Sequence, residues 1–308
     1  MQLVRYADGT SSGLGVWLGG QIFSLSSGLE RLRERGRARG FSDALLRAVA
    51  REPKSLLICF DAVRGLIELA IDSDDGSGMI PGGLSAVSVL PFVADPEKVF
   101  GLSYNYRTLA TQEKVELSPS PVVFTKAPSS VAGPFDDIHV PPDIQSVDFE
   151  AEICVVLGKA ARRVSREDAA SYIAGYTVLN DLTAKILPRP KLDLQTITVP
   201  LKAIDSFAPI GPVICTRDEA RDLSSSFLTC RVNGEERQNF PVTDWIHDSA
   251  DAVSYLSSFV TLQPGDLISM GTSQGVGIAD VPPRLLKDGD VVEVGLSGLP
   301  STRNTIRF

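Results

Sequence analysis

An acidic segment that leads into an apolar run places the strongest constraint on this 308-residue chain. It reads Asp148-Phe149-Glu150-Ala151-Glu152 and continues as Ile153-Cys154-Val155-Val156-Leu157, whose β-branched and apolar residues predict a strand. Successive side chains of a strand point to opposite faces, so Asp148, Glu150 and Glu152 are expected on one face. Three adjacent anions repel one another unless a cation neutralises them, and hard carboxylate oxygens suit Mg²⁺, Mn²⁺ or Ca²⁺.

A carboxylate from a second strand strengthens this metal hypothesis. Asp181 lies near the end of the strand-like run 175–182, and a third carboxylate there would complete a site with positions left for substrate oxygens. Without Asp181, a solvated edge strand paired with Lys or Arg is an equally good interpretation. Glu150, Glu152 and Asp181 are therefore the predicted metal ligands. Asp148 stands at the mouth of the strand, where a ligand role and a solvent or helix-side role remain open.

Charge and cysteine content limit the partners of the chain. The net charge of -8 should repel nucleic acid and anionic membranes, and no apolar run approaches the roughly 20 residues of a membrane span. We therefore expect a small-molecule substrate and a cytoplasmic location, since no secretory signal is evident. The four cysteines form no close pair, and Cys154 and Cys215 are expected as buried thiols. The arginine run over residues 31–39 favours a solvated, poorly ordered helix face over an anion-binding patch.

The chain is expected to fold as a small N-terminal α/β domain, 1–92, and a larger domain, 93–308. Residues 1–25 alternate apolar runs with glycine-rich turns, which predicts a small sheet, and helical spacing predicts helices near 41–51 and 55–72. Residues 72–92 are polar and rich in glycine, so we place the boundary after them.

The second domain is predicted to consist mostly of strands. Asn233-Gly234 predicts a hairpin, because both residues tolerate positive φ. Helices are expected over 166–173, after a Ser165/Asp168 capping box, and over 249–260. Many strands with few helices indicate an α+β, β-rich roll rather than a doubly wound sheet.

Several motifs in this domain resemble the fumarylacetoacetate hydrolase family. The resemblance covers roughly residues 98–308 and is closest to its branch of acylpyruvate hydrolases, oxaloacetate decarboxylases and other 2-oxo acid enzymes. No single motif is specific, but their number and order carry the resemblance. In chain order they are residues 101–107, 124–130 with Gly133-Pro134, 149–152, 175–181, Lys202 with 205–212, and 271–277.

The resemblance implies a fold, a chemistry and a set of roles. It implies a mixed β-roll, usually in a homodimer, with Mg²⁺ or Mn²⁺ on the three predicted ligands and the metal on the 2-oxo and carboxylate oxygens of the substrate. Lys202 would stabilise an enolate as a carbon–carbon bond breaks. The implied substrate-binding residues are Tyr106, Arg107, Lys185, Gly271, Thr272 and Ser273, of which Thr272 and the glycine-loop amides would hold the carboxylate.

The sequence departs from the family pattern where water is activated. The family usually has a histidine and a glutamate where this chain has Leu109 and Gln112, neither of which is an effective base. Glu113 is adjacent to Gln112 and is the predicted replacement, provided that the helix expected to carry these residues, a lid over the site, shifts its register. His139 and His247 lie outside the family motifs and are expected in structural or surface roles. Lys185 stands where the family has arginine, and it keeps the charge without the bidentate fork.

Three functions follow from these residues. The family implies a metal-dependent hydrolase of carbon–carbon bonds in a β-diketo or acylpyruvate-like acid. The missing dyad favours a non-hydrolytic lyase or isomerase, namely a decarboxylase, tautomerase, dehydratase or cyclase. A catalytically idle metal-binding scaffold is a third alternative, against which the retained ligands and Lys202 argue.

Overall fold

A long mixed sheet runs through the computed structural model, which describes residues 1–9, 11–185 and 199–308. Its strands are β1 Gln2–Ala7, β2 Ser12–Leu18, β3 Gln21–Ser24, β4 Met79–Ile80, β5 Ser88–Leu90, β6 Val99–Ser103, β7 Val122–Lys126, β11 Ala151–Leu157, β12 Ile173–Asn180, β15 Val213–Thr216 and β18 Leu267–Ser269. Across the described residues they follow the order β4-β3-β2-β1-β15-β12-β11-β18-β6-β7, and β5 pairs with β1. Neighbours are antiparallel except for the parallel pair β18 and β6.

A second sheet packs against the long one. Its strands are β9 Ile138–His139, β16 Phe227–Val232, β17 Glu235–Pro241, β19 Val291–Leu296 and β20 Asn304–Arg307, in the order β17-β16-β19-β20-β9. The predicted hairpin is confirmed, with Asn233 and Gly234 both at positive φ between β16 and β17. Side chains of both sheets, such as Val155 and Val294, share one buried apolar cluster. The predicted α+β, β-rich architecture is therefore confirmed.

Two short strand pairs and several helices complete the described structure. The pairs are β10 Val147–Asp148 with β13 Thr183–Ala184, and β8 Val131–Ala132 with β14 Ala208–Pro209. The α-helices are α1 Leu25–Glu34, α2 Asp43–Arg51, α3 Pro53–Asp72, α4 Arg107–Gln112, α5 Arg166–Ala169, α6 Val199–Lys202 and α7 Ser249–Phe259. The 3-10 helices are η1 Gly83–Ala86, η2 Pro128–Ser130, η3 Ala170–Tyr172, η5 Glu219–Ser225, η6 Val242–Asp244 and η7 Gly277–Ala279.

The helices near 41–51 and 55–72 are confirmed as α2 and α3. Arg31 and Arg33 of the arginine run lie on α1, and Arg33 and Arg35 are 39% and 47% exposed, which agrees with a solvated helix face. Arg31 forms an ion pair with Asp74. One other helix prediction needs correction. The helix predicted over 166–173 ends its α-helical part at Ala169 and continues as η3, because the buried strand β12 begins at Ile173.

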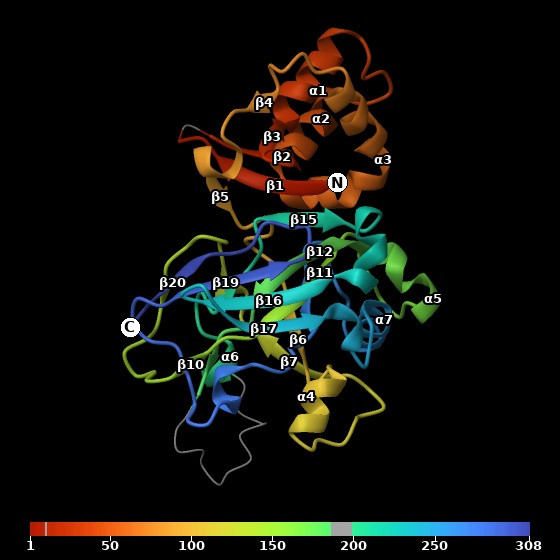
Figure 1. The fold of residues 1–308 in the computed structure, drawn as a ribbon. Helices are drawn as coiled ribbons and strands as arrows, with labels where there is room; N and C mark the ends of the chain where they lie inside the picture. The colour runs from red at the N-terminus through yellow and green to blue at the C-terminus, as the bar shows by residue number, and fades with distance from the viewer. Residues whose placement is uncertain (10, 186–198) are drawn as a thin grey trace.

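Residues 1–92 join the rest of the molecule through the sheet itself. Strand β1 pairs with β15, so α1–α3 and β1–β5 lie directly above the remaining strands in Figure 1. Apolar residues of the first helices share a buried cluster with residues of β11, β12 and β15. The division into two domains at residue 93 stays a prediction, since one sheet extends across it.

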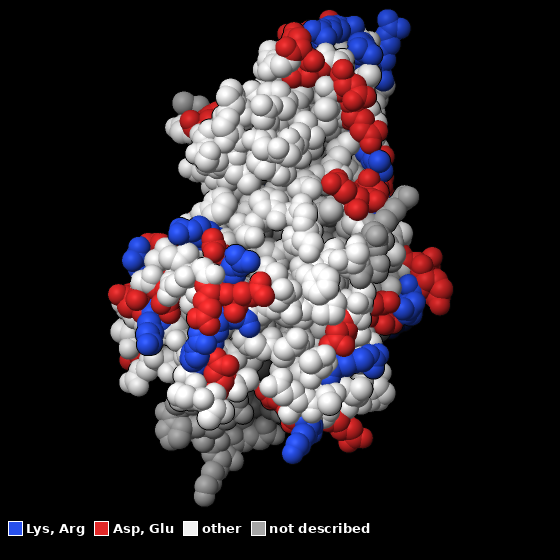
Figure 2. Space-filling view, in the orientation of Figure 1, with Lys and Arg blue, Asp and Glu red and all other residues white. Residues whose placement is uncertain are grey.

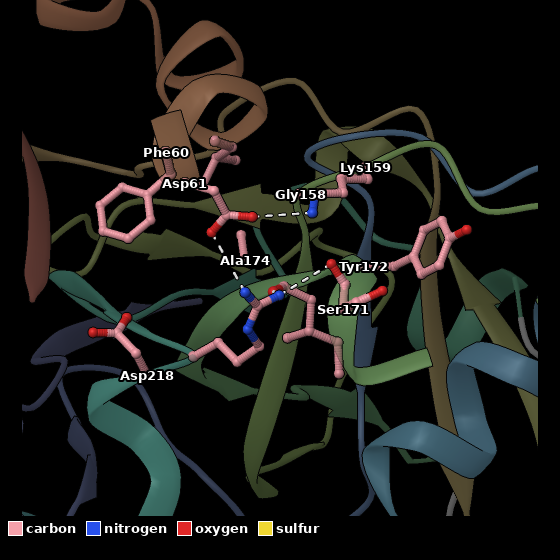
Figure 3. Close-up of a pocket in the computed structure, with 11 residues that line it drawn as sticks. Phe60, Asp61, Gly158, Lys159, Ser171, Tyr172, Ala174 and Asp218 are labelled. Atoms are coloured by element: carbon pink, nitrogen blue, oxygen red, sulfur yellow. Dashed lines mark hydrogen bonds and ion pairs between the residues drawn. The ribbon is translucent and has the colours of Figure 1, made fainter. Parts of the chain in front are cut away.

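Polar contacts fix α3 against the lower strands at a small pocket (Figure 3). Asp61 of α3 accepts from Lys159 at 3.0 Å and from Arg217 at 3.4 Å. Arg217 also donates to the carbonyls of Ala170, Ser171 and Ile173, at 3.2, 3.0 and 3.2 Å. One guanidinium thus ties α3 to the start of β12.

The surface carries charged side chains of both signs, and the two cysteines predicted to be buried are buried. On the face drawn in Figure 2, basic and acidic side chains lie beside one another in several groups. The middle of this face, between the groups, is uncharged. None of the helices in the described ranges is long and apolar enough to cross a membrane. Cys154 and Cys215 are buried free thiols, as predicted.

Candidate active site

Antiparallel pairing brings the three predicted metal ligands together. Strand β11 is buried along its whole length, and its first residue, Ala151, is paired with Asn180 at the end of β12. Glu150 immediately precedes Ala151 and Asp181 immediately follows Asn180, and the Asp181 amide donates to the Glu150 carbonyl at 2.9 Å. One carboxylate oxygen each of Glu150, Glu152 and Asp181 lies within 4.8 Å of the others.

This donor set fits a hard divalent cation. Three carboxylates of which two are fully buried offer the oxygen ligands that Mg²⁺, Mn²⁺ and Ca²⁺ prefer. Buried anions at this spacing repel one another strongly unless positive charge is supplied. Glu150, Glu152 and Asp181 are the residues that would hold the cation, and this ligand assignment stays a prediction.

Asp148 does not join this cluster. The strand is interrupted between β10 and β11, so the alternation of faces does not extend from Glu152 back to Asp148. Its carboxylate instead accepts from the amides of Gly277 and Ile278, at 2.8 and 2.9 Å. Asp148 therefore anchors the chain around η7, so of the roles left open for it the contact with a helix is the one observed.

Three lysines surround the acidic cluster. Lys202 donates to Glu150 at 2.7 Å and also to Asp181. Lys185 donates to Glu150 at 3.2 Å. Lys126, to which the sequence assigned no role, donates to Asp181 at 2.6 Å, and both of these side chains are fully buried. Its only signal in the sequence was its place at the end of a strand with β-branched and aromatic residues.

The pKa values of Glu150 and Glu152 are shifted in opposite directions. Burial alone would raise the pKa of Glu150, but the charges of Lys202 and Lys185 outweigh it and lower that pKa to about 2. Burial, reinforced by the charge of Asp181, raises the pKa of Glu152 to about 8. Within the described ranges no lysine donates a hydrogen bond to Glu152, which accepts from the Ser269 hydroxyl at 2.5 Å and the Gly271 amide at 2.8 Å.

The predicted glycine loop adjoins the acidic cluster. Gly271, at φ +88°, approaches the carbonyl of Leu102, where a side chain would collide. The hydroxyl of Thr272 donates to the Ala151 carbonyl at 2.9 Å, and that of Ser273 donates to Gln274. The structure places these three residues at the site, and their contact with a substrate carboxylate stays a prediction.

The remaining predicted residues form no hydrogen bond to the acidic cluster within the described ranges. Tyr106 is fully buried, packs edge-on against Phe240, and its hydroxyl has no hydrogen-bond partner among the described residues. Burial, with a smaller contribution from the charge of Glu152, raises its pKa. Arg107 and Glu113 lie exposed at the two ends of α4, and neither bonds to the acidic cluster within the described ranges.

The dyad positions and the histidines lie in different surroundings. Leu109 is buried on α4, whereas Gln112 is exposed. Glu113 accepts from the Tyr104 hydroxyl at 3.3 Å. His247 contacts the Ser118 carbonyl at 3.2 Å, and His139 is exposed on β9, so their structural or surface roles stay a prediction.

Two further polar residues at the site escaped the sequence analysis. Thr183 donates to Glu150 at 3.1 Å and lies between Asp181 and Lys185, in a segment where this chain departs from the family pattern. Gln238 of β17 is 1% exposed and bonds to both β11 and the glycine loop.

Comparison with known proteins decides the family. Residues 98–307 match the family model described as fumarylacetoacetate (FAA) hydrolase C-terminal. The chain belongs to the fumarylacetoacetate hydrolase family. It is 35% identical over 222 residues to the mitochondrial oxaloacetate tautomerase fahd2 of Xenopus laevis, an alignment that covers 72% of this chain and 69% of that protein.

Solved structures of this family share the whole fold. Fumarylacetoacetate hydrolase from psychrophilic Exiguobacterium antarcticum is 29% identical, with a TM-score of 0.76 over 100% of this chain and 99% of that one. Maleylpyruvate hydrolase from Sphingobium sp. SYK-6, solved with manganese(II) and pyruvate, is 26% identical, with a TM-score of 0.73 and the same coverage. The predicted family and its mixed β-roll are confirmed, and the chain is an enzyme of this family.

Proposed function

We propose that this chain is a metal-dependent tautomerase that interconverts the keto and enol forms of a small 2-oxo dicarboxylic acid such as oxaloacetate. One observation carries the proposal. The ammonium of Lys202 contacts two carboxylates of the acidic cluster, and Leu109, which the motif resemblance aligns with the family's water-activating histidine, is a buried apolar side chain. The site thus offers positive charge for an enolate but lacks the usual base for hydrolysis.

The reaction requires little beyond this arrangement. A bound divalent cation would polarise the 2-oxo and carboxylate oxygens of the substrate. Tautomerisation moves a proton from carbon 3, where a C–H bond breaks, to the 2-oxo oxygen, where an O–H bond forms. A water molecule at the site would accept the first proton and deliver the second, so no water is consumed. Lys202 is 16% exposed and can donate a hydrogen bond to the negative oxygen that develops. Burial of Glu152 and Asp181 limits water, which strengthens every charge interaction in the site.

The charge of the site supports an anionic substrate. Lys126, Lys185 and Lys202 face the three carboxylates of the cluster, and Lys185 also lies 3.8 Å from the fourth carboxylate, Asp148. A bound divalent cation would therefore make the formal charge of these groups positive. The name of the relative from Xenopus laevis, an oxaloacetate tautomerase, agrees with this substrate class.

Hydrolysis of a carbon–carbon bond, which the family implies, is the second candidate. The likeness to maleylpyruvate hydrolase favours it. It requires an activated water, and Glu113 is the acidic residue nearest in sequence to the altered dyad. Because Glu113 contacts Tyr104 rather than the acidic cluster, we rank hydrolysis below tautomerisation.

Isotope exchange and product analysis separate the two reactions. The purified protein with Mg²⁺ or Mn²⁺ is incubated with oxaloacetate in deuterated water, and with acylpyruvates in ¹⁸O-water. We expect metal-dependent exchange at carbon 3 of oxaloacetate that Lys202→Met lowers about 100-fold or more. Lys54→Met, a surface change, serves as the control. Incorporation of ¹⁸O into a released carboxylic acid, without exchange above the metal-only rate, would instead identify a hydrolase.

Assembly and location belong to the same proposal. We expect a homodimer, and the uncharged middle of the face in Figure 2 is a suitable surface, since the cores of protein interfaces are depleted in charge. Light scattering of the purified protein tests this. We expect the enzyme to act in the cytoplasm, and its free cysteines suit such a reducing compartment.

A further inference from the structure

Gln238 connects the two sheets at the acidic cluster. It lies on β17, yet its side chain leaves that sheet and bonds to the strand of the metal ligands. Its Oε1 accepts from the Ala151 amide at 2.9 Å. Its Nε2 donates to the Thr272 hydroxyl at 2.9 Å and faces the carbonyls of Ser273 and Gln274 at 3.3 and 3.2 Å.

These bonds close a ring around Ala151. The Thr272 hydroxyl that accepts from Gln238 donates in turn to the Ala151 carbonyl at 2.9 Å. Both backbone groups of Ala151 are therefore held by side chains. They take the place of a strand, because the pairing of β18 with β11 extends only from Cys154 to Val156. Without this ring, a buried N–H and a buried C=O would lose their partners.

The position of Ala151 gives this ring its consequence. Ala151 separates Glu150 from Glu152, and Gly271, the loop residue before Thr272, donates its amide to Glu152 at 2.8 Å. We propose that Gln238 is a positioning residue of the metal centre, which fixes the strand that carries Glu150 and Glu152 against the glycine loop. The inference rests on the proposed metal site but not on the proposed reaction.

A second contact supports the same coupling of β17 to the loop. Gly275, at φ +90°, lies so close to the carbonyl of Arg237 that a Cβ would stand 2.2 Å from that oxygen. The loop therefore lies directly against the backbone next to Gln238. Glutamine suits the junction because it supplies one acceptor and two donors at once, whereas glutamate supplies no donor and asparagine is shorter.

Metal affinity tests the proposal without any substrate. Gln238→Met keeps the volume and removes the bonds, and Thr272→Val breaks the same ring with almost no change in shape. In the full chain, Mn²⁺ affinity is measured by the electron spin resonance of free Mn²⁺, and folding by circular dichroism. We expect each variant to bind Mn²⁺ about 10- to 100-fold more weakly, as is typical when outer-shell partners are lost. Asn239→Ala, an exposed change on the same strand, should bind like the parent.

The double variant tests the ring itself. Because both side chains hold Ala151 together, the loss in Gln238→Met with Thr272→Val should be much smaller than the product of the two single losses. A folded Gln238→Met or Thr272→Val protein with Mn²⁺ affinity within twofold of the parent would overturn the proposal, and so would two losses that multiply fully. Since no substrate is present, a failure of the proposed reaction would not affect this readout.

Discussion

Lys126 and Asp181 form an ion pair of 2.6 Å in which neither side chain has any exposed surface. Breaking such a pair leaves an uncompensated buried charge, which typically costs about 3–5 kcal/mol. Lys126→Met should therefore destabilise the metal-free protein by about 3 kcal/mol, at the lower end because Asp181 keeps Lys202 as a partner. Urea unfolding measures this.

The matched control is the pair of Lys159 with Asp61. Its two atoms lie 3.0 Å apart, but the side chains are 46% and 56% exposed. Lys159→Met should cost less than about 1 kcal/mol, as exposed ion pairs do. Equal effects of the two substitutions would show that burial does not govern the contribution of Lys126.

Loss of one predicted ligand should abolish tight metal binding. Glu150→Gln keeps the shape of the side chain but removes the charge that Lys202 and a cation share. We expect Mn²⁺ affinity to fall by more than the roughly 10- to 100-fold typical of outer-shell residues. Titration calorimetry checks this, with the exposed Glu97→Gln as the control. Unchanged affinity in a folded Glu150→Gln protein would contradict the ligand assignment.

Restoring the family's dyad should add hydrolysis. Leu109→His with Gln112→Glu supplies a base on α4, and a positioned base contributes about 10²–10⁴-fold in rate. We expect the rate of acylpyruvate hydrolysis to rise at least roughly tenfold. The carboxylic acid that is released measures this rate. Leu109→Asn with Gln112→Glu provides a polar control without histidine. If the two double variants hydrolyse equally slowly while remaining folded, the altered dyad is not what limits hydrolysis.

The metal-free protein should lose stability as the pH rises toward 9. The pKa of Glu152 is raised to about 8 in the folded protein, from the ordinary glutamate value of 4.5, chiefly because the side chain is buried. Between these two values the folded state holds a proton that the unfolded state has released, so this residue's contribution to stability is complete below about pH 4.5 and is lost as the pH passes 8. Melting temperatures of the chelator-treated protein at pH 6 and pH 9 test this.

Glu152→Gln isolates the contribution of this residue. An amide cannot ionise, so the variant should lose less stability than the parent over the same pH interval. Parallel pH profiles of parent and variant would show that another group governs the change.

The sequence predicted those parts of the site that depend on local periodicity. Alternation along a strand and a carboxylate at the end of the next strand sufficed to select Glu150, Glu152 and Asp181. Alternation failed for Asp148, because the strand is interrupted between Asp148, where β10 ends, and Ala151, where β11 begins. Nothing in the chain near Asp148 indicates that interruption.

The missed residues owe their roles to pairings over long distances in sequence. Lys126 is 55 residues from Asp181, and Gln238 is 87 residues from Ala151. No local pattern marks a lysine or a glutamine as buried, since their neighbours on β7 and β17 are ordinary strand residues. Only the order of strands in the two sheets shows what these side chains meet.

The pairing of β1 with β15 has a consequence for any shortened version of this chain. The part that matches the family model, residues 98–307, does not contain the strand that covers the outer edge of β15. In the intact chain the sheet instead terminates at β4, whose two residues are too short to serve as a template for another strand. Residues 1–92 thus cover a strand edge that could otherwise pair with another chain. A fragment without them would expose the unpaired backbone groups of β15 together with the apolar surface that α1–α3 cover, and both favour aggregation.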